Sequence, residues 1–386
     1  MKGGRTLTFR YHTSDKLTNL QAQSLVSKLT YSLEGISACY LDGENQDIVI
    51  HANDDSNRSQ IEDTVLLLME QERTIRTLKS RVIRNVSTND DNYKSPFPGA
   101  SYHPDWSFAS DGSVRRDFAV MLYQSIDGIL SNLAMERHAK YRKYPSMIPL
   151  KTLDKCGYVT TFPQNIYLVS EIPHQSDILQ KIKKTGDVES NLRQSQYALS
   201  PAVCFHCYEE LAGQTLEHPV ILTALGTCYR HEATWRLGNQ RLNEFSMREV
   251  VLIGTPDFVE SERNWWVDCI WKLFGDLGLT GRIETANDPF YFSDDAAKAQ
   301  HQQMANMKYE LVVEVDGGTQ TFSIASFNNI REALCKPFRI TDAADKPLHS
   351  GCIAFGIDRW VFSLLKKYGE DPGKWQPHIA EMMRFS

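Results

Sequence analysis

Residues 223–251, TALGTCYRHEATWRLGNQRLNEFSMREVV, decide the fold of this chain. Two runs of high β-propensity, at 223–231 and 244–253, flank a polar loop that contains Arg, Gly and Asn. The pattern predicts a long antiparallel hairpin, on which the rest of the chain is organised.

The two arms of this hairpin carry residues suited to nucleotide binding. The first arm ends in Arg230 and Glu232, and the return arm carries Arg241, Phe245 and Glu249, whose side chains alternate between faces. Guanidinium groups pair with phosphate oxygens in bidentate fashion, and an aromatic ring can stack on a purine. The hairpin therefore suggests a nucleotide site.

Composition limits the class of protein. With 386 residues and 41% hydrophobic content, the chain can form one large core and a small accessory domain. We find no apolar membrane span and no apolar signal core near the N-terminus, so we expect a soluble, cytoplasmic protein without membrane contact. The net charge of −6 gives no global basic field for nucleic acid.

The cysteines raise the question of a metal. Eight in a chain of this size are too few for a disulfide scaffold and indicate a reducing compartment. Cys204 and Cys207 form a CxxC before a helix expected to begin near Glu209, but a four-thiolate site needs a second pair. Either one of the two binds metal with distant partners, or both are small buried hydrophobic residues.

Residues 1–88 are predicted to form a separate domain of order βαββα, typical of a split-βαβ sandwich. Eleven basic residues balance eleven acidic ones in this segment, which argues against an RNA-binding arm. A docking or dimerisation module is the plainer interpretation.

The remainder is divided into a linker or arm, residues 89–112, and a catalytic domain, residues 113–386. In the latter we expect helices at 115–140, 176–196, 259–279 and 357–367, and strands at 166–169, 308–315, 321–326 and 351–356. Arg359 falls in the first turn of the last helix, where it could reach a phosphate or form a solvated ion pair.

Together, YRHE, the return strand ending in REVV, and GCIAFGIDRW resemble motifs 2 and 3 of a class II aminoacyl-tRNA synthetase core, and the long helix takes the place of motif 1. The resemblance implies an α+β fold, an antiparallel sheet flanked by helices, and a homodimer. Within the class, Arg241, Phe245 and Glu249 match the pattern of seryl-tRNA synthetases.

One departure changes the expected chemistry. Val203, Cys204 and Phe205 replace the family's Thr-Ala-Glu, which removes the carboxylate that grips the amino acid. Cys204, Glu249 and Cys352 match the zinc ligands shared by atypical seryl-tRNA synthetases and bacterial amino acid:[carrier protein] ligases. The resemblance thus implies Zn²⁺ with an open position for the substrate amine.

Between these relatives, the ligases fit better. Segments 153–164 and 287–290 resemble them, and the compact N-terminal unit replaces a tRNA-binding arm. The implied reaction activates a small amino acid with ATP as an aminoacyl-adenylate and transfers it to the phosphopantetheine thiol of a carrier protein. No nucleic-acid partner is expected.

The resemblance also implies roles for single residues. Arg230 would hold the α-phosphate, and Glu232 the adenine amino group or Mg²⁺. Arg241 and Arg359 would lie on the triphosphate tail and the opposite face of the adenine. The remaining expected nucleotide contacts are Phe245 on the adenine, Leu242 at the loop exit, and Ser326 at ribose or metal.

The expected Mg²⁺ site departs from the family. The metal-binding glutamate of seryl-tRNA synthetases falls here at Thr321 or Phe322, and Glu310 or Glu314 would compensate if they face inward. Two alternatives therefore stand beside the ligase: a divergent zinc-dependent seryl-tRNA synthetase, and a catalytically silent paralogue that senses amino acid or serves as a scaffold.

Overall fold

The computed structural model describes residues 7–13, 16–43, 46–53, 58–75, 78–86, 106–109, 112–115, 117–238, 240–286 and 305–383. Segment 287–290, which carries part of the family resemblance, lies outside these ranges. Among the described residues, no helix has the length and apolar character needed to cross a membrane.

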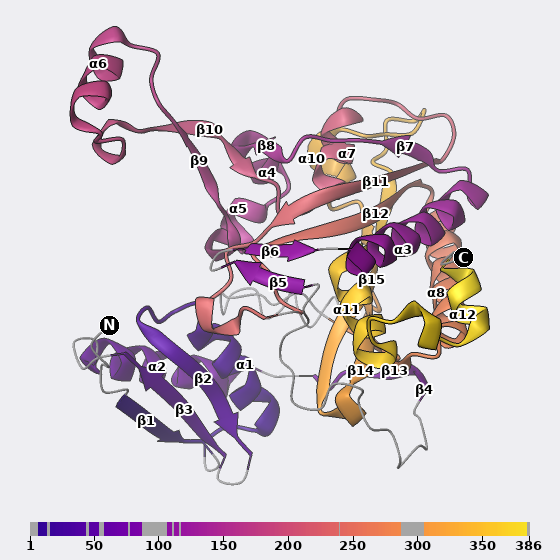
Figure 1. Ribbon diagram of the computed structural model, residues 1–386. Helices are drawn as coiled ribbons and strands as arrows, with labels where there is room; N and C mark the ends of the chain where they lie inside the picture. The colour runs from indigo at the N-terminus through magenta and orange to yellow at the C-terminus, as the bar shows by residue number, and fades with distance from the viewer. Residues whose placement is uncertain are drawn as a thin grey trace.

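The N-terminal domain has the predicted βαββα order (Figure 1). Its elements are β1 (Leu7–His12), α1 (Asn19–Thr30), β2 (Ile36–Asp42), β3 (Asp47–Ala52) and α2 (Arg58–Thr74). The three strands pair in the order β1-β3-β2, and both helices pack on one core that contains Leu25, Ile50 and Val65. Thr18 caps α1 by accepting from the Gln21 backbone N–H, as its sequence position favours.

The main sheet contains eight strands within the described ranges, in the order β4-β13-β14-β15-β16-β12-β11-β7. All neighbours are antiparallel except β7 and β11. The bounds are β4 (Val82–Val86), β7 (Lys140–Arg142), β11 (Val220–Tyr229), β12 (Glu244–Gly254), β13 (Thr280–Thr285), β14 (Lys308–Val315), β15 (Gln320–Arg331) and β16 (His349–Gly356). The β11–β12 pair confirms the hairpin predicted at residues 223–251.

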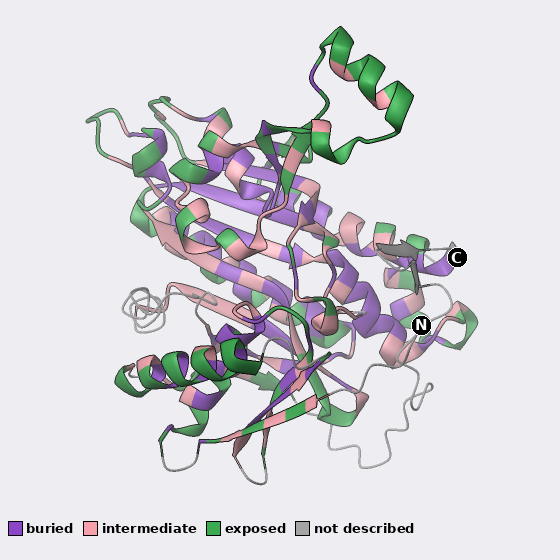
Figure 2. Ribbon diagram, turned by 90° about the vertical axis from the view of Figure 1, so that its left-hand side faces the viewer, coloured by how far each residue is buried: buried purple, intermediate pink, exposed green. Residues whose placement is uncertain are grey.

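Helices cover one face of this sheet (Figures 1 and 2). They are α3 (Asp117–Glu136), α8 (Pro256–Asp276), α11 (Ile357–Tyr368) and α12 (Pro377–Met382). Val250 and Leu252 of β12 and Phe355 of β16 contribute to the core beneath them. Arg248, on the same face, donates to both carboxylate oxygens of Asp127 in α3, at 2.5 and 2.9 Å, and so joins the helix to the sheet.

The opposite face carries shorter elements. These are α4 (Leu150–Lys155), α5 (Tyr158–Thr161), α7 (Cys204–Glu210) and α10 (Cys335–Phe338), with a small sheet of β8 (Met147–Pro149), β9 (Leu168–Glu171) and β10 (Arg193–Leu199). Short 3-10 turns are η1 (Pro163–Asn165), η2 (Glu189–Asn191), η3 (Thr234–Arg236), η5 (Asp316–Gly318) and η6 (Pro372–Lys374). A second core, with Leu222, Val251 and Cys352, lies between α7, α10 and the sheet.

The structure departs from the sequence predictions in three places. The helix predicted at 176–196 is α6 (Ser176–Thr185) alone, because residues from Arg193 onward pair in β10. Helix α7 begins at Cys204, not near Glu209. Strand β4, within the segment assigned to the accessory domain, pairs with β13 of the main sheet.

Helix α6 and a short hairpin in the predicted linker lie outside the two domains' sheets. Helix α6 has no buried residue and stands away from the body at the end of β9 and β10 (Figures 1 and 2). In the segment predicted as a linker, β5 (Trp106–Ala109) and β6 (Gly112–Arg115) form a two-stranded hairpin.

Candidate active site

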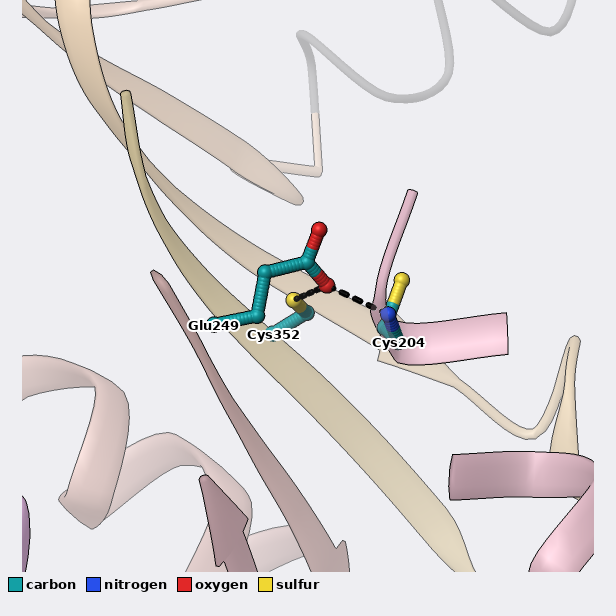
Figure 3. A group of neighbouring side chains, drawn as sticks. All are labelled: Cys204, Glu249 and Cys352. Atoms are coloured by element: carbon teal, nitrogen blue, oxygen red, sulfur yellow. Dashed lines mark hydrogen bonds between the residues drawn. The ribbon is translucent and has the colours of Figure 1, made fainter. Parts of the chain in front are cut away.

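Three side chains from distant parts of the chain meet at one point (Figure 3). Cys204 begins α7, Glu249 lies in β12 and Cys352 lies in β16, and their ligand atoms are all within 4.8 Å of one another. All three are buried. The β12–β16 register pairs Val251 with Cys352, so Glu249 and Cys352 point to the same face as diagonal neighbours.

Glu249 organises this cluster through its carboxylate. The Cys204 backbone N–H donates to its Oε2 at 2.7 Å and the Val203 backbone N–H donates to its Oε1 at 3.2 Å. The Cys352 thiol also donates to Oε2, at 3.3 Å. The first turn of α7 is therefore held directly against β12, which places the Cys204 sulfur beside the other two groups.

The electrostatics of the cluster favour a cation. The hydrogen bond with Cys352, burial and the Glu249 charge raise the pKa of Cys204 well above its ordinary value. The hydrogen bond with Cys204 lowers the pKa of Cys352, but burial and Glu249 outweigh it and raise that pKa to about 12. A divalent cation would compensate the negative charge of both thiolates and the carboxylate.

The donor set fits zinc. Two sulfur ligands and one carboxylate are typical of Zn²⁺, and three protein ligands leave a fourth tetrahedral position open, as in catalytic zinc sites. Mg²⁺ prefers oxygen ligands, so a site with two sulfur donors does not suit it. Among the described residues this is the single Cys, His, Asp or Glu group with the spacing of a metal site.

An arginine cluster lies on the loop side of the same hairpin. Burial and the positive charges of Arg241 and Arg230 lower the pKa of Arg359 to about 10. Its guanidinium donates to two backbone carbonyls, of Gln240 at 2.7 Å and Ser323 at 2.8 Å. Three guanidiniums close enough to repel one another would be stabilised by a polyanion such as a triphosphate.

Arg230 connects the arginine cluster to the metal cluster. Its guanidinium carbon lies 5.2 Å from the centre of the Phe245 ring, and its Nε donates to the Pro201 carbonyl at 3.2 Å. Pro201 is in the segment that enters α7 at Cys204. A group bound between Arg230 and Cys204 would thus contact both parts of the site.

Glu232 is fixed from two sides. Arg241 donates to its Oε1 at 2.8 Å, and the hydroxyl of Tyr31, from the N-terminal domain, donates to its Oε2 at 3.0 Å. Its backbone N–H donates to the Asn243 side chain at 3.0 Å. No pattern in the sequence predicts the contribution of Tyr31, which precedes Glu232 by 201 residues.

A polar row crosses the sheet beside the metal cluster. The register places Glu310 opposite Ser326, Ser326 opposite Ala354, and Ala354 opposite Glu249, so all four share one face. The charge of Glu310 also raises the pKa of Arg359, which indicates that the two groups are close. Glu310 therefore lies on the face of the sheet that carries Glu249.

Three residues expected at the nucleotide or its Mg²⁺, Leu242, Ser326 and Glu314, contact other parts of the protein. Leu242, expected as a nucleotide contact, is 9% exposed and packs its side chain in the main core. Ser326 accepts from the Asn328 side chain at 3.0 Å, and Asn328 donates in turn to the Cys352 carbonyl at 2.9 Å. Glu314 accepts from Arg282 at 3.1 Å, as Glu310 does from Lys308 at the same distance.

Comparison with known proteins relates the chain to class II synthetases and to amino acid ligases. The tRNA synthetase class II core domain (G, H, P, S and T) matches residues 187–368. Amino acid--[acyl-carrier-protein] ligase 1 of Bradyrhizobium diazoefficiens is 31% identical over 294 residues, which cover 71% of this chain and 88% of that protein. A type-2 serine--tRNA ligase of Methanocaldococcus jannaschii is 28% identical over 62% of this chain and 49% of its own length.

A solved structure shows the same fold. The M. kandleri seryl-tRNA synthetase, crystallised with A. aeolicus tRNASec, superposes with a TM-score of 0.67 at 18% identity and covers 98% of this chain and 77% of that one. The antiparallel sheet flanked by helices, expected from the sequence, is confirmed.

Proposed function

The chain belongs to the family of amino acid--[acyl-carrier-protein] ligases, and from this we propose that it activates a small amino acid with ATP and passes the aminoacyl group to the phosphopantetheine thiol of a carrier protein. The observation that carries the proposal is the buried Cys204, Glu249 and Cys352 cluster beside the arginine-lined end of the hairpin. It offers one place for an amine and an adjacent place for phosphates.

The cluster would serve as the amino-acid anchor. Cys204, Glu249 and Cys352 would hold a zinc ion, whose open position would take the substrate's deprotonated amine. This anchor would bind the amine that all amino acids share, so selection among amino acids would depend on the residues around the substrate side chain. Proximity to Arg230 would then orient the substrate carboxylate toward the nucleotide.

In the first step, the amino acid carboxylate attacks the α-phosphorus of ATP, the bond to the β-phosphate breaks, and pyrophosphate leaves. Arg230 would hold the α-phosphate and stabilise the charge that develops there. Arg241 and Arg359 would bind the triphosphate and the face of the adenine opposite Phe245, which would stack on the ring. Glu232 would accept from the adenine amino group.

Magnesium would accompany the triphosphate. Glu310 supplies an inward carboxylate and Ser326 a hydroxyl on the same row of the sheet, and oxygen donors of this type suit Mg²⁺. Lys308 Nζ lies 3.1 Å from Glu310 Oε1, and this ion pair would have to loosen when Glu310 binds the ion. We therefore assign Glu310 the role expected of the glutamate absent at Thr321 and Phe322.

In the second step, the carrier thiol attacks the activated carbonyl, a thioester forms, and AMP leaves with the former carboxylate oxygen. Because a thiol has a pKa of about 8.5, only a few per cent is thiolate near neutral pH; this fraction attacks after its proton has passed to solvent, and the equilibrium replenishes it, so no dedicated base in the protein is required.

We also propose that the ligase is a homodimer. The outward side of α3 and the adjoining β7 expose apolar side chains, with Met121, Met135 and Tyr141 each close to half exposed. The inward side of the same helix packs Leu122 and Leu130 in the main core. Sedimentation analysis of the purified chain would measure the mass in solution, and a monomer at all concentrations would contradict this assignment.

The test of the function uses one protein preparation. Purified protein with ATP and a panel of small amino acids should support amino-acid-dependent pyrophosphate exchange, and labelled amino acid should pass to a phosphopantetheinylated carrier protein and not to tRNA. Transfer to tRNA alone would favour a synthetase, and no exchange with any amino acid would refute adenylation.

Matched cysteine variants test the anchor. Cys204→Ser should lose zinc, measured by elemental analysis, and abolish exchange. Cys335→Ser is the control, because Cys335 is equally buried in the same core but lies outside the cluster. Full exchange by the metal-free protein would remove the anchor from the proposal.

A further inference from the structure

We propose that the N-terminal domain forms part of the nucleotide site, and that Tyr31 is a positioning residue that sets the Glu232 carboxylate for adenine recognition. The inference rests on the proposed function, because it gives Glu232 its role there. It assigns to the accessory domain a task that neither its fold nor its charge indicated.

The first observation is the contact itself. Tyr31 ends α1, and its hydroxyl donates to Glu232 Oε2 at 3.0 Å while Arg241 donates to Oε1 at 2.8 Å. One oxygen is thus held by the N-terminal domain and the other by the hairpin loop. Burial, followed by the Glu232 charge, raises the pKa of Tyr31, so the phenol remains a donor at neutral pH.

The second observation is the anchor of the loop. Trp235, in η3, packs against the apolar core of the N-terminal domain and not against either core of the main sheet. Figure 1 shows the salmon loop that carries η3 beside the indigo domain. This partly buried tryptophan joins the loop to the domain through an apolar contact, so the loop and the domain would move together.

The third observation is the charge near this junction. Arg236, the neighbour of Trp235, is close enough to Cys39 of β2 and to Tyr31 for their charges to affect its pKa, which burial and Arg241 lower. The hairpin loop therefore places Trp235 and Arg236 against the N-terminal domain and Arg241 toward the nucleotide. Displacing the domain would release Glu232 and the loop at once.

The consequence is a specific effect on nucleotide affinity. Glu232 would contact the adenine, which is the same in ground state and transition state, so misplacing it should weaken binding uniformly. Tyr31→Phe keeps the ring and deletes the hydroxyl. We expect the ATP dissociation constant and KM to rise about tenfold, equivalent to about 1.4 kcal/mol, with kcat nearly unchanged.

The experiment compares four full-length proteins: wild type, Tyr31→Phe, Glu232→Gln and the double variant. ATP affinity is measured by calorimetry, which needs no turnover, and KM and kcat by pyrophosphate exchange. If Tyr31 acts through Glu232, the double variant should bind ATP no more weakly than Glu232→Gln alone. Tyr40→Phe, an exposed tyrosine of the same domain, is the control and should match wild type.

A second measurement addresses the loop. Trp235→Ala should increase amide hydrogen exchange across residues 232–241, and Tyr31→Phe should do so to a lesser degree. Equal ATP affinity of wild type and Tyr31→Phe would overturn the inference, as would additive effects in the double variant. If the wild type binds ATP without exchange for any amino acid, the proposed function fails while the role of Tyr31 is still decided by affinity.

Discussion

Glu249 offers the sharpest test of the site, because its carboxylate accepts three hydrogen bonds and is one of only three proposed metal ligands in the described part of the chain. In Glu249→Gln, the side chain keeps its shape but presents an NH₂ group to one of the backbone N–H donors of α7. That orphaned buried donor should lower the free energy of unfolding by about 1–3 kcal/mol even without metal.

The metal adds a second, separable loss. At free zinc near 100 times the wild-type dissociation constant, bound zinc stabilises the fold by about 2.7 kcal/mol. Losing one of three ligands should weaken binding by at least the roughly 100-fold known for lesser changes around metal sites. The same free zinc would then stabilise the variant by only about 0.4 kcal/mol.

The assay is denaturant unfolding in zinc-buffered and chelator-treated solution. Wild type should gain about 2.7 kcal/mol from zinc, the variant about 0.4, and Cys335→Ser as much as wild type. A zinc-dependent gain in Glu249→Gln equal to that of wild type would show that Glu249 is not a ligand.

The remaining predictions concern the fold and its response to pH. Arg248→Ala should lower the free energy of unfolding by about 3–5 kcal/mol, because it leaves Asp127 without its buried partner. Denaturant titration measures this change, and a loss below about 1 kcal/mol would contradict the prediction. Gly281→Ala should greatly lower the free energy of unfolding, because a Cβ at its φ of +154° would lie 2.0 Å from the Val312 carbonyl oxygen. Gly275→Ala in α8 is the control: its Cβ meets nothing within 4 Å, so the free energy of unfolding should stay the same or rise. Burial raises the pKa of Cys39 from 9.0 to about 12, so its thiol ionises first in the unfolded chain. The free energy of unfolding should therefore fall as the pH rises from 9 toward 12, and should fall less in Cys39→Ala. Equal slopes of unfolding free energy against pH in the two proteins would refute the assignment.

Much of the fold could be predicted because its signals are local. The hairpin follows from two β-prone runs around a polar loop, and α11 with Arg359 in its first turn follows from a glycine-punctuated strand before an amphipathic segment. The start of α7 was placed too late, because CFHCY has no N-terminal capping residue. Its helix is fixed instead by the Glu249 carboxylate, which accepts from the Cys204 backbone N–H across the core.

The sequence by itself determined the βαββα order of the N-terminal domain, the hairpin at residues 223–251 and the residue types of the site, since alternation, helical period and motif spacing depend on neighbours in the chain. Tertiary structure decided which side chains meet: that Cys204, Glu249 and Cys352 converge, that Glu310 shares their face, and that Tyr31 reaches Glu232. Sheet register and domain packing set these contacts, and both arise from burial of apolar surface between segments too far apart in the chain for any local pattern to relate them.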